Sequence, residues 1–125
     1  MFKLNSLLLL LPLLAACPPA GDTASTDTAL CSTGTEWTGG DEESPNMSPG
    51  QDCIACHASG EGPTFTIAGT VMGDYADPDD CNGVEGMIVR ITDAEGVVSE
   101  LTSNAAGNFY STDDIAMPYT AEVEG

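Results

Sequence analysis

The sequence predicts a mainly β protein, in which a small antiparallel β-sandwich follows a disordered acidic tether and a short helix. Three observations support this fold class. After residue 16 there are 15 Leu, Ile, Val and Phe residues, and 13 of them lie in residues 65–125. Over that region apolar and polar residues alternate in short runs, and turn-forming residues separate the runs. Residues 18–50 contain only Leu30 from this apolar set, which is too little to form a core.

Residues 1–16 have the pattern of an export signal, with Lys3 near the start, an apolar run and small residues at the end. The run is shorter than the ~20 apolar residues of a transmembrane helix. Its ending, LAAC at residues 14–17, resembles the lipobox of bacterial lipoproteins, in which the cysteine becomes the lipid-modified first residue. The resemblance implies a bacterial protein anchored by lipid on Cys17 to a membrane of the cell envelope, periplasmic or outer. An ordinary signal, with Cys17 paired to another thiol, is the alternative.

Residues 17–47 consist mainly of Pro, Gly, Ser, Thr and acidic residues, and this composition predicts a flexible, solvated tether. The whole chain has 20 Asp and Glu against 2 Lys and Arg, a net charge of −18. Such a charge excludes a nucleic-acid role that rests on a basic surface. It suits either basic partner proteins or a salty habitat.

Residues 48–62 contain the sequence CIACH, which runs from Cys53 to His57. Cys-x-x-Cys-His is the spacing used for covalent attachment of a c-type haem. In such a site the two thiols, here Cys53 and Cys56, add across the haem vinyl groups, and the imidazole, here His57, is the proximal iron ligand. His57 is the single histidine of the sequence, so the chain cannot supply a second one. The motif predicts one haem c.

A short helix over residues 49–58 is expected to carry this motif. Ser48 would be its N-cap, Pro49 its first residue and Gln51 the second member of a capping box, while Gly60 would end it. The two cysteines and the histidine then lie three and four residues apart on one helix face. All three side chains could therefore reach one flat macrocycle.

The two cysteines of the motif have other interpretations. They could form a redox-active disulfide, or bind zinc together with His57, Cys31 or Cys81. A thioredoxin-type motif would follow a strand, and no strand pattern precedes residue 53. Zinc is disfavoured because the adjacent side chains of Cys56 and His57 are awkward ligands for one tetrahedral ion.

A methionine is one candidate for the sixth ligand of a haem iron, with water, another protein or no ligand as the alternatives. Met47 is the nearest, just before the expected helix, and an ordinary loop methionine is the alternative interpretation of this residue. Met72 and Met117 are weaker candidates. Met87 alternates with Val89, which predicts a core position instead.

Cys31 and Cys81 remain once the lipid and haem cysteines are assigned, and a disulfide between them would tie the tether to the C-terminal domain. Cys81 lies in an acidic loop. The loop's oxygen-bearing residues could bind calcium, although their order does not fit an EF-hand, and a solvated loop is the alternative. They are Asp74, Asp77, Asp79, Asp80, Asn82 and Glu85.

Five segments from residue 65 onward alternate as β-strands do, and no helical pattern separates them. The segments are residues 65–71, 86–93, 97–103, 108–112 and 119–125. In residues 65–71, one face is expected to carry Phe65, Ile67, Gly69 and Val71. In residues 86–93, one face is expected to carry Met87, Val89 and Ile91. Turn signals at 93–96, at 104–108 and at Pro118 separate the later segments. Residues 63–125 are therefore expected to form an antiparallel sandwich.

Four short motifs in residues 63–125 make the prediction of a sandwich more specific. They are Gly69-Thr70-Val71, Gly86-Met87-Ile88-Val89 leading to Asp93 and Gly96, Thr102 with Gly107-Asn108-Phe109-Tyr110, and Pro118-Tyr119-Thr120-Ala121. Their pattern resembles the carboxypeptidase-regulatory-like domains, small transthyretin-like β-sandwiches of exported bacterial proteins. The resemblance implies a structural or adhesive module without catalytic residues. Such a sandwich usually has one more strand after the position of Gly125, so an incomplete sandwich is expected.

These features predict a membrane-anchored c-type haem lipoprotein that transfers one electron in the cell envelope and is not an enzyme. A hydrolase is disfavoured because Cys56 and His57, adjacent on a helix, diverge and cannot act as nucleophile and base. The 48–62 segment is too short to wrap a haem, so the tether or the sandwich must cover it, or the haem stays open to solvent. The alternative is a non-catalytic β-sandwich lipoprotein without haem, with a structural or binding role.

Overall fold

The computed structural model describes residues 31–39, 43–60 and 62–125. The expected signal of residues 1–16, the lipid cysteine Cys17 and the tether up to residue 30 lie outside the described residues. Within the described part, no helix has the length and apolar character needed to cross a membrane.

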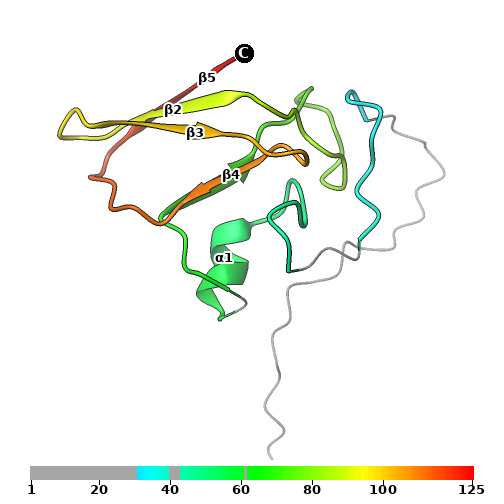
Figure 1. Ribbon diagram of the computed structural model, residues 1–125, viewed down its shortest axis with the longest axis horizontal. Helices are drawn as coiled ribbons and strands as arrows, with labels where there is room; N and C mark the ends of the chain where they lie inside the picture. Colours follow the sequence, from blue (N-terminus) through cyan, green and yellow to red (C-terminus); the bar gives the residue numbers. More distant parts are fainter. Residues whose placement is uncertain (1–30, 40–42, 61) are drawn as a thin grey trace, which may run out of the picture.

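The described chain is mainly β, as the alternation predicts, and all of its strand pairs are antiparallel. In chain order the elements are α1 (Cys53–Ala58), β1 (Ile67–Thr70), β2 (Ile88–Thr92), β3 (Val98–Thr102), β4 (Asn108–Ser111) and β5 (Thr120–Glu124). β1 pairs with β4, and a second sheet has the order β3-β2-β5. Figure 1 shows the second sheet on one side of the β1–β4 pair and α1 on the other. The five expected strands and the sandwich-like class are thus confirmed.

The core lies between the two sheets, where the strand alternation places its apolar residues. Val89 and Ile91 of β2 and Ile67 of β1 are buried and form the central cluster. Four partly buried side chains pack around them: Val71, Leu101, Phe109 and Ile115. Burial of side chains of this size contributes about 1.5–3 kcal/mol each to stability. Met87, expected in this core by its register, is only half-buried and lies outside the cluster.

β5 is covered far less than the other strands. All five of its residues are exposed, including Val123, which keeps 51% of its surface although it pairs with the buried Val89 in register. The β1–β4 pair therefore shields the β2 and β3 part of the larger sheet and leaves the inner face of β5 open.

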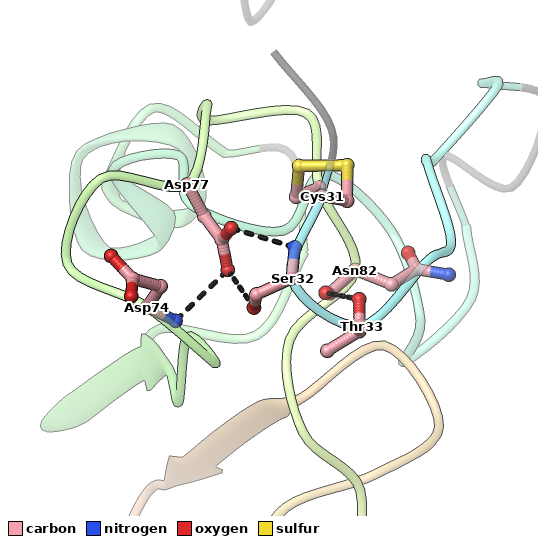
Figure 2. Close-up of a disulfide and its surroundings, with 7 residues drawn as sticks. Cys31, Ser32, Thr33, Asp74, Asp77 and Asn82 are labelled. Atoms are coloured by element: carbon pink, nitrogen blue, oxygen red, sulfur yellow. Dashed lines mark hydrogen bonds between the residues drawn. A yellow bond between two sulfur atoms is a disulfide. The ribbon is translucent and has the colours of Figure 1, made fainter.

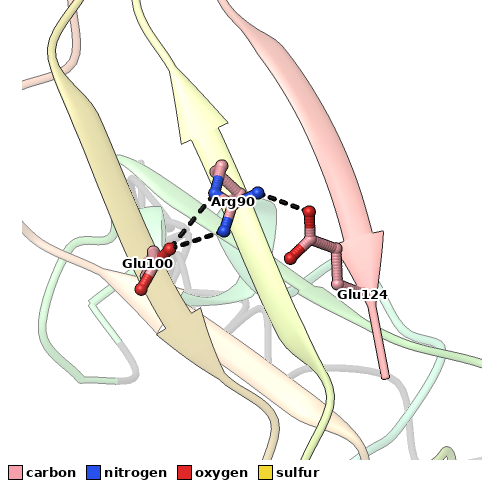
Figure 3. A network of polar contacts seen from close by, with 3 residues as sticks. All are labelled: Arg90, Glu100 and Glu124. Atoms are coloured by element: carbon pink, nitrogen blue, oxygen red, sulfur yellow. Dashed lines mark hydrogen bonds and ion pairs between the residues drawn. The ribbon is translucent and has the colours of Figure 1, made fainter.

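On the outer face of the larger sheet, one guanidinium joins all three strands (Figure 3). Arg90 of β2 donates from Nε and Nη2 to Glu100 of β3, at 3.1 and 2.9 Å, and from Nη1 to Glu124 of β5. These hydrogen bonds, first to Glu100 and then to Glu124, raise the pKa of Arg90. Arg90 and Glu100 are also direct partners in the β2–β3 register, so the network favours this alignment of the strands.

The turns are held by side chains that accept bonds from the backbone. Asp93 Oδ1 accepts from the N–H groups of Glu95 and Val97, both at 2.9 Å, which closes the β2–β3 turn. Hydrogen bonds from the backbone, that of Val97 above all, lower the pKa of Asp93. Asn104 Oδ1 closes the β3–β4 turn in a similar way, since it accepts from the backbone N–H groups of Ala106 and Asn108, both at 3.0 Å. Both turns lie where the sequence predicts them.

Residues 31–39 lie beside the acidic loop of residues 72–82 and differ in this from the flexible tether expected there (Figure 1). Cys31 and Cys81 form a disulfide with a Cα–Cα distance of 5.4 Å, as their pairing by elimination predicts. Next to it, Asp77 accepts from the backbone N–H of Ser32 at 2.8 Å and from its hydroxyl at 2.6 Å (Figure 2). Backbone bonds from Trp37 to Asp80 and from Asn82 to Thr35 continue the pairing. We call residues 31–39 the N-terminal strap.

The segment just before α1 is also fixed to the sandwich, and its conformation overturns the predicted helix start. Asn108 Nδ2 donates to the carbonyl of Met47 at 2.8 Å, and Gly50 N–H donates to the Thr70 hydroxyl at 2.9 Å. Ser48 has a positive φ of 44°, so it is not an N-cap, and Pro49 is fully buried rather than the first residue of a helix. The helix begins four residues later than residue 49, because these tertiary contacts hold the chain in a turn.

Candidate functional site

The CIACH motif forms helix α1. Asp52 is its N-cap, with a carboxylate oxygen that accepts from the N–H of Ala55 at 3.0 Å. The helix ends at Ala58, as predicted, and the next turn contains Gly60 with a φ of 103°. All three motif side chains therefore lie on one helix at the expected three- and four-residue spacings.

His57 is the buried residue of α1, with 6% of its surface exposed. Its Nδ1 lies 2.9 Å from the carbonyl oxygen of Pro63, and a carbonyl can only accept, so Nδ1 carries the proton in this bond. The tautomer that this bond selects has a lone pair on Nε2. A backbone carbonyl on Nδ1 is the common way in which proteins orient a histidine whose Nε2 binds a metal.

The face of the His57 ring packs on a stack of two further aromatic rings. The centroids of His57 and Phe65 are 4.2 Å apart, and those of Phe65 and Tyr110 are 4.8 Å apart. A Cβ atom on Gly62 would lie 2.9 Å from His57 Cε1, so the loop before β1 touches the imidazole. The Phe65 ring, the loop at Gly62 and the Pro63 carbonyl together fix the plane of the His57 imidazole.

The aromatic stack lies on the outer side of the β1–β4 pair, away from the core. Phe109 packs into the core, and Tyr110, the next residue of β4, points to the opposite face by the alternation of a strand. That is the side on which α1 lies in Figure 1. Phe65, expected on the core face with Ile67, instead precedes β1 and stacks on His57, so this part of the prediction is wrong.

The two cysteines of α1 differ in state. Cys53 is a free, half-buried thiol whose Sγ lies 3.4 Å from the carbonyl oxygen of Gln51, and burial raises its pKa. Cys56, in contrast, is disulfide-bonded. A raised pKa keeps Cys53 protonated and makes it a poor spontaneous nucleophile. Thioether attachment at Cys56 would first need its disulfide to be reduced.

The described residues do not bring together the other ligand sets considered from the sequence. Cys31 and Cys81 are bonded to each other, so neither can complete a zinc site with the α1 motif. Among the described residues there is no group of three or more His, Cys, Asp or Glu side chains placed to hold a metal ion. In the acidic loop, Asp77 is used to hold Ser32 and the N–H of Asp74, and the hydrogen bonds from Ser32 lower its pKa.

Met47 is held through its backbone: its carbonyl accepts from Asn108, and its N–H lies 3.2 Å from the Ser44 carbonyl oxygen. None of these contacts involves its sulfur, so a role as sixth ligand stays a prediction.

The sequence did not single out Pro63 or Tyr110 as part of this site. Of these two residues only Pro63 has a signal in the sequence. It follows Gly62 and lies six residues after His57, and a Gly-Pro pair indicates a turn, which here brings the Pro63 carbonyl back to the helix.

Comparison with known proteins gives no match: no family model fits the sequence, and no curated protein and no solved structure is significantly similar to it.

Proposed function

We propose that this protein is a c-type haem lipoprotein that transfers single electrons in the cell envelope. Cys53 and Cys56 would hold one haem c through thioether bonds, and His57 would be its proximal ligand. When bound, the haem would supply one-electron redox chemistry. The chain's own residues would fix the ligand, limit access of water and present an acidic surface to a partner.

One observation carries this proposal: the orientation of His57. A buried imidazole whose Nδ1 is bonded to the Pro63 carbonyl has its second nitrogen left for a metal, and the same helix holds two sulfurs at haem-attachment spacing. The loop and the aromatic stack keep the ring in one plane, which lowers the cost of ordering the ligand when iron binds.

The chemistry at the sulfurs balances in two steps. The Cys56 disulfide takes up two electrons and two protons from a thiol reductant, which leaves a free thiol. Each thiol then adds its S–H across one vinyl group, so thioether formation consumes no further oxidant or reductant. Cys53 already has the thiol form that this addition needs.

The setting proposed for this activity follows from the sequence. Lipid on Cys17 would anchor the protein to a membrane of the cell envelope, and the chain would not be an enzyme. With 20 acidic residues against 2 basic ones, the partner best suited to it is a basic redox protein, and no nucleic-acid partner is proposed.

The test is expression of the exported chain in a host with cytochrome c maturation machinery. We expect a band that stains for haem peroxidase on a denaturing gel, a pyridine haemochrome spectrum of the c type, and an intact mass increased by one haem. Replacing both motif cysteines, Cys53→Ser and Cys56→Ser, should abolish the stain. Cys31→Ser, at a cysteine outside the motif, should keep it, because covalently bound haem survives unfolding on the gel.

Abundant lipidated protein that carries no haem would refute the proposal. It would favour a second function, a structural or binding lipoprotein in which the β-sandwich is the working part. Two observations speak for that function: Cys56 is disulfide-bonded, and His57 is packed and hydrogen-bonded by the chain itself.

A further inference from the structure

The stack of His57, Phe65 and Tyr110 runs from the buried imidazole to the surface. His57 has 6% of its surface exposed, whereas Tyr110 at the other end has 43% exposed. The two centroid distances of 4.2 and 4.8 Å mean that each ring touches the next, with no room for a layer of water between them. The stack is therefore a continuous aromatic connection from the proposed iron ligand to the solvent.

We propose that Tyr110 is the point at which a cationic one-electron partner contacts this protein, with Phe65 joining that contact to His57. This inference rests on the proposed haem function. In each encounter one electron passes from the reduced protein to the oxidised partner, and no proton or covalent bond is exchanged. Packed aromatic rings carry an electron across the span between Tyr110 and His57 better than a water-filled gap of the same length does.

The acidic character of the chain favours a cationic partner, since the sequence has 20 acidic residues against 2 basic ones. Asp113 and Asp114, three and four residues after Tyr110 in the sequence, are exposed. Of the two basic residues in the sequence, Arg90 is engaged by Glu100 and Glu124 on the outer face of the other sheet. A cation can also lie over the exposed part of the tyrosine ring, since aromatic rings attract cations. A second copy of this acidic chain would instead be repelled.

The experiment uses the haem-loaded protein and hexaammineruthenium(III), a cationic one-electron acceptor, in stopped-flow measurements. Loss of the ring in Tyr110→Leu should slow electron transfer about three- to tenfold, from the lost aromatic and cation contact. Phe65→Leu should slow it as well, and Tyr110→Phe should restore the rate because the ring is kept. Tyr75→Leu is the matched control, since Tyr75 is fully exposed on the acidic loop and outside the stack. Its rate should equal that of the unmodified protein.

A second measurement does not depend on electron transfer or on any variant. Hexaamminechromium(III), a paramagnetic cation of the same charge that is not reduced under these conditions, broadens the amide NMR signals of residues near which it binds. We expect broadening around residues 109–114. Broadening confined to the acidic loop of residues 72–82 would overturn the inference.

The outcomes separate the two proposals. If the protein takes up haem and Tyr110→Leu reacts as fast as Tyr75→Leu, the inference about Tyr110 is wrong and the haem function stands. If the protein takes up no haem, both fall together.

Discussion

The disulfide between Cys31 and Cys81 is expected to be the largest single contribution of the N-terminal strap to stability. It joins residues 50 apart in the sequence, and the chain-entropy relation for a loop of that length gives about 4 kcal/mol at 25 °C. The double variant Cys31→Ala, Cys81→Ala removes this constraint. The hydrogen bonds of the strap to Asp77 and Asn82 can still form, so the loss should be close to the entropic value.

Urea unfolding measures this loss, followed by far-UV circular dichroism and by fluorescence of Trp37, the single tryptophan, which lies in the strap. With urea m-values of about 1–3 kcal/mol/M, a loss of about 4 kcal/mol lowers the midpoint by roughly 1.3–4 M. Ser32→Ala is the control. It removes one hydroxyl bond to Asp77 and keeps the disulfide, so its midpoint should change much less.

A double variant that unfolds at the same urea concentration as the unmodified protein, with the same slope, would refute the entropic reasoning. A fluorescence transition that precedes the dichroism transition would show that the strap detaches by itself. In that case the disulfide stabilises the strap and not the whole domain.

Three further predictions concern charge, close packing and the core. The pKa of Asp77 is lower in the folded protein than its ordinary value of 3.8. The ionised carboxylate therefore stabilises the folded state at pH values above 3.8, and this contribution is lost as the pH falls through the pKa of the folded protein. Asp77→Asn should therefore melt earlier than the unmodified protein at pH 7 and by a smaller margin at pH 3, while Glu85→Gln, an exposed change three residues after this loop, should alter neither melting temperature. Gly62→Ala should lower the melting temperature and the yield of haem-loaded protein, because its Cβ would lie 2.9 Å from His57; a melt identical to that of the unmodified protein would contradict this packing. Val89→Ala should cost about 2 kcal/mol in urea unfolding, and a loss below about 0.5 kcal/mol would place Val89 outside the core.

The strands and the core were predictable because a sheet has a strict two-residue period. Val89 and Ile91 are apolar neighbours two apart, and both are buried as the alternation requires. The same rule failed at Phe65, where the chain has not yet entered β1, so its ring turns to α1 and stacks on His57. Alternation is a property of strands, and it says nothing about the residues just outside them.

The helix start and the tether were misjudged because both depend on contacts between distant residues. Ser48 and Pro49 form a good local capping signal, yet the side chains of Asn108 and Thr70 bind the backbone of this segment and hold it in a turn. The strap has almost no apolar residues, which predicts a free chain. It is fixed instead by one disulfide and by carboxylate and backbone hydrogen bonds, which composition does not reveal.

The Cys31–Cys81 bond has a topological consequence. It closes a covalent ring through the polypeptide, and both α1 and β1 lie within that ring. A protease that cuts the backbone once between the two cysteines would therefore not release a fragment, and the nicked protein would gain only the mass of one water. After a cut between α1 and Cys81, the CIACH helix would stay covalently attached to the strands that follow the cut until a reductant opened the bond.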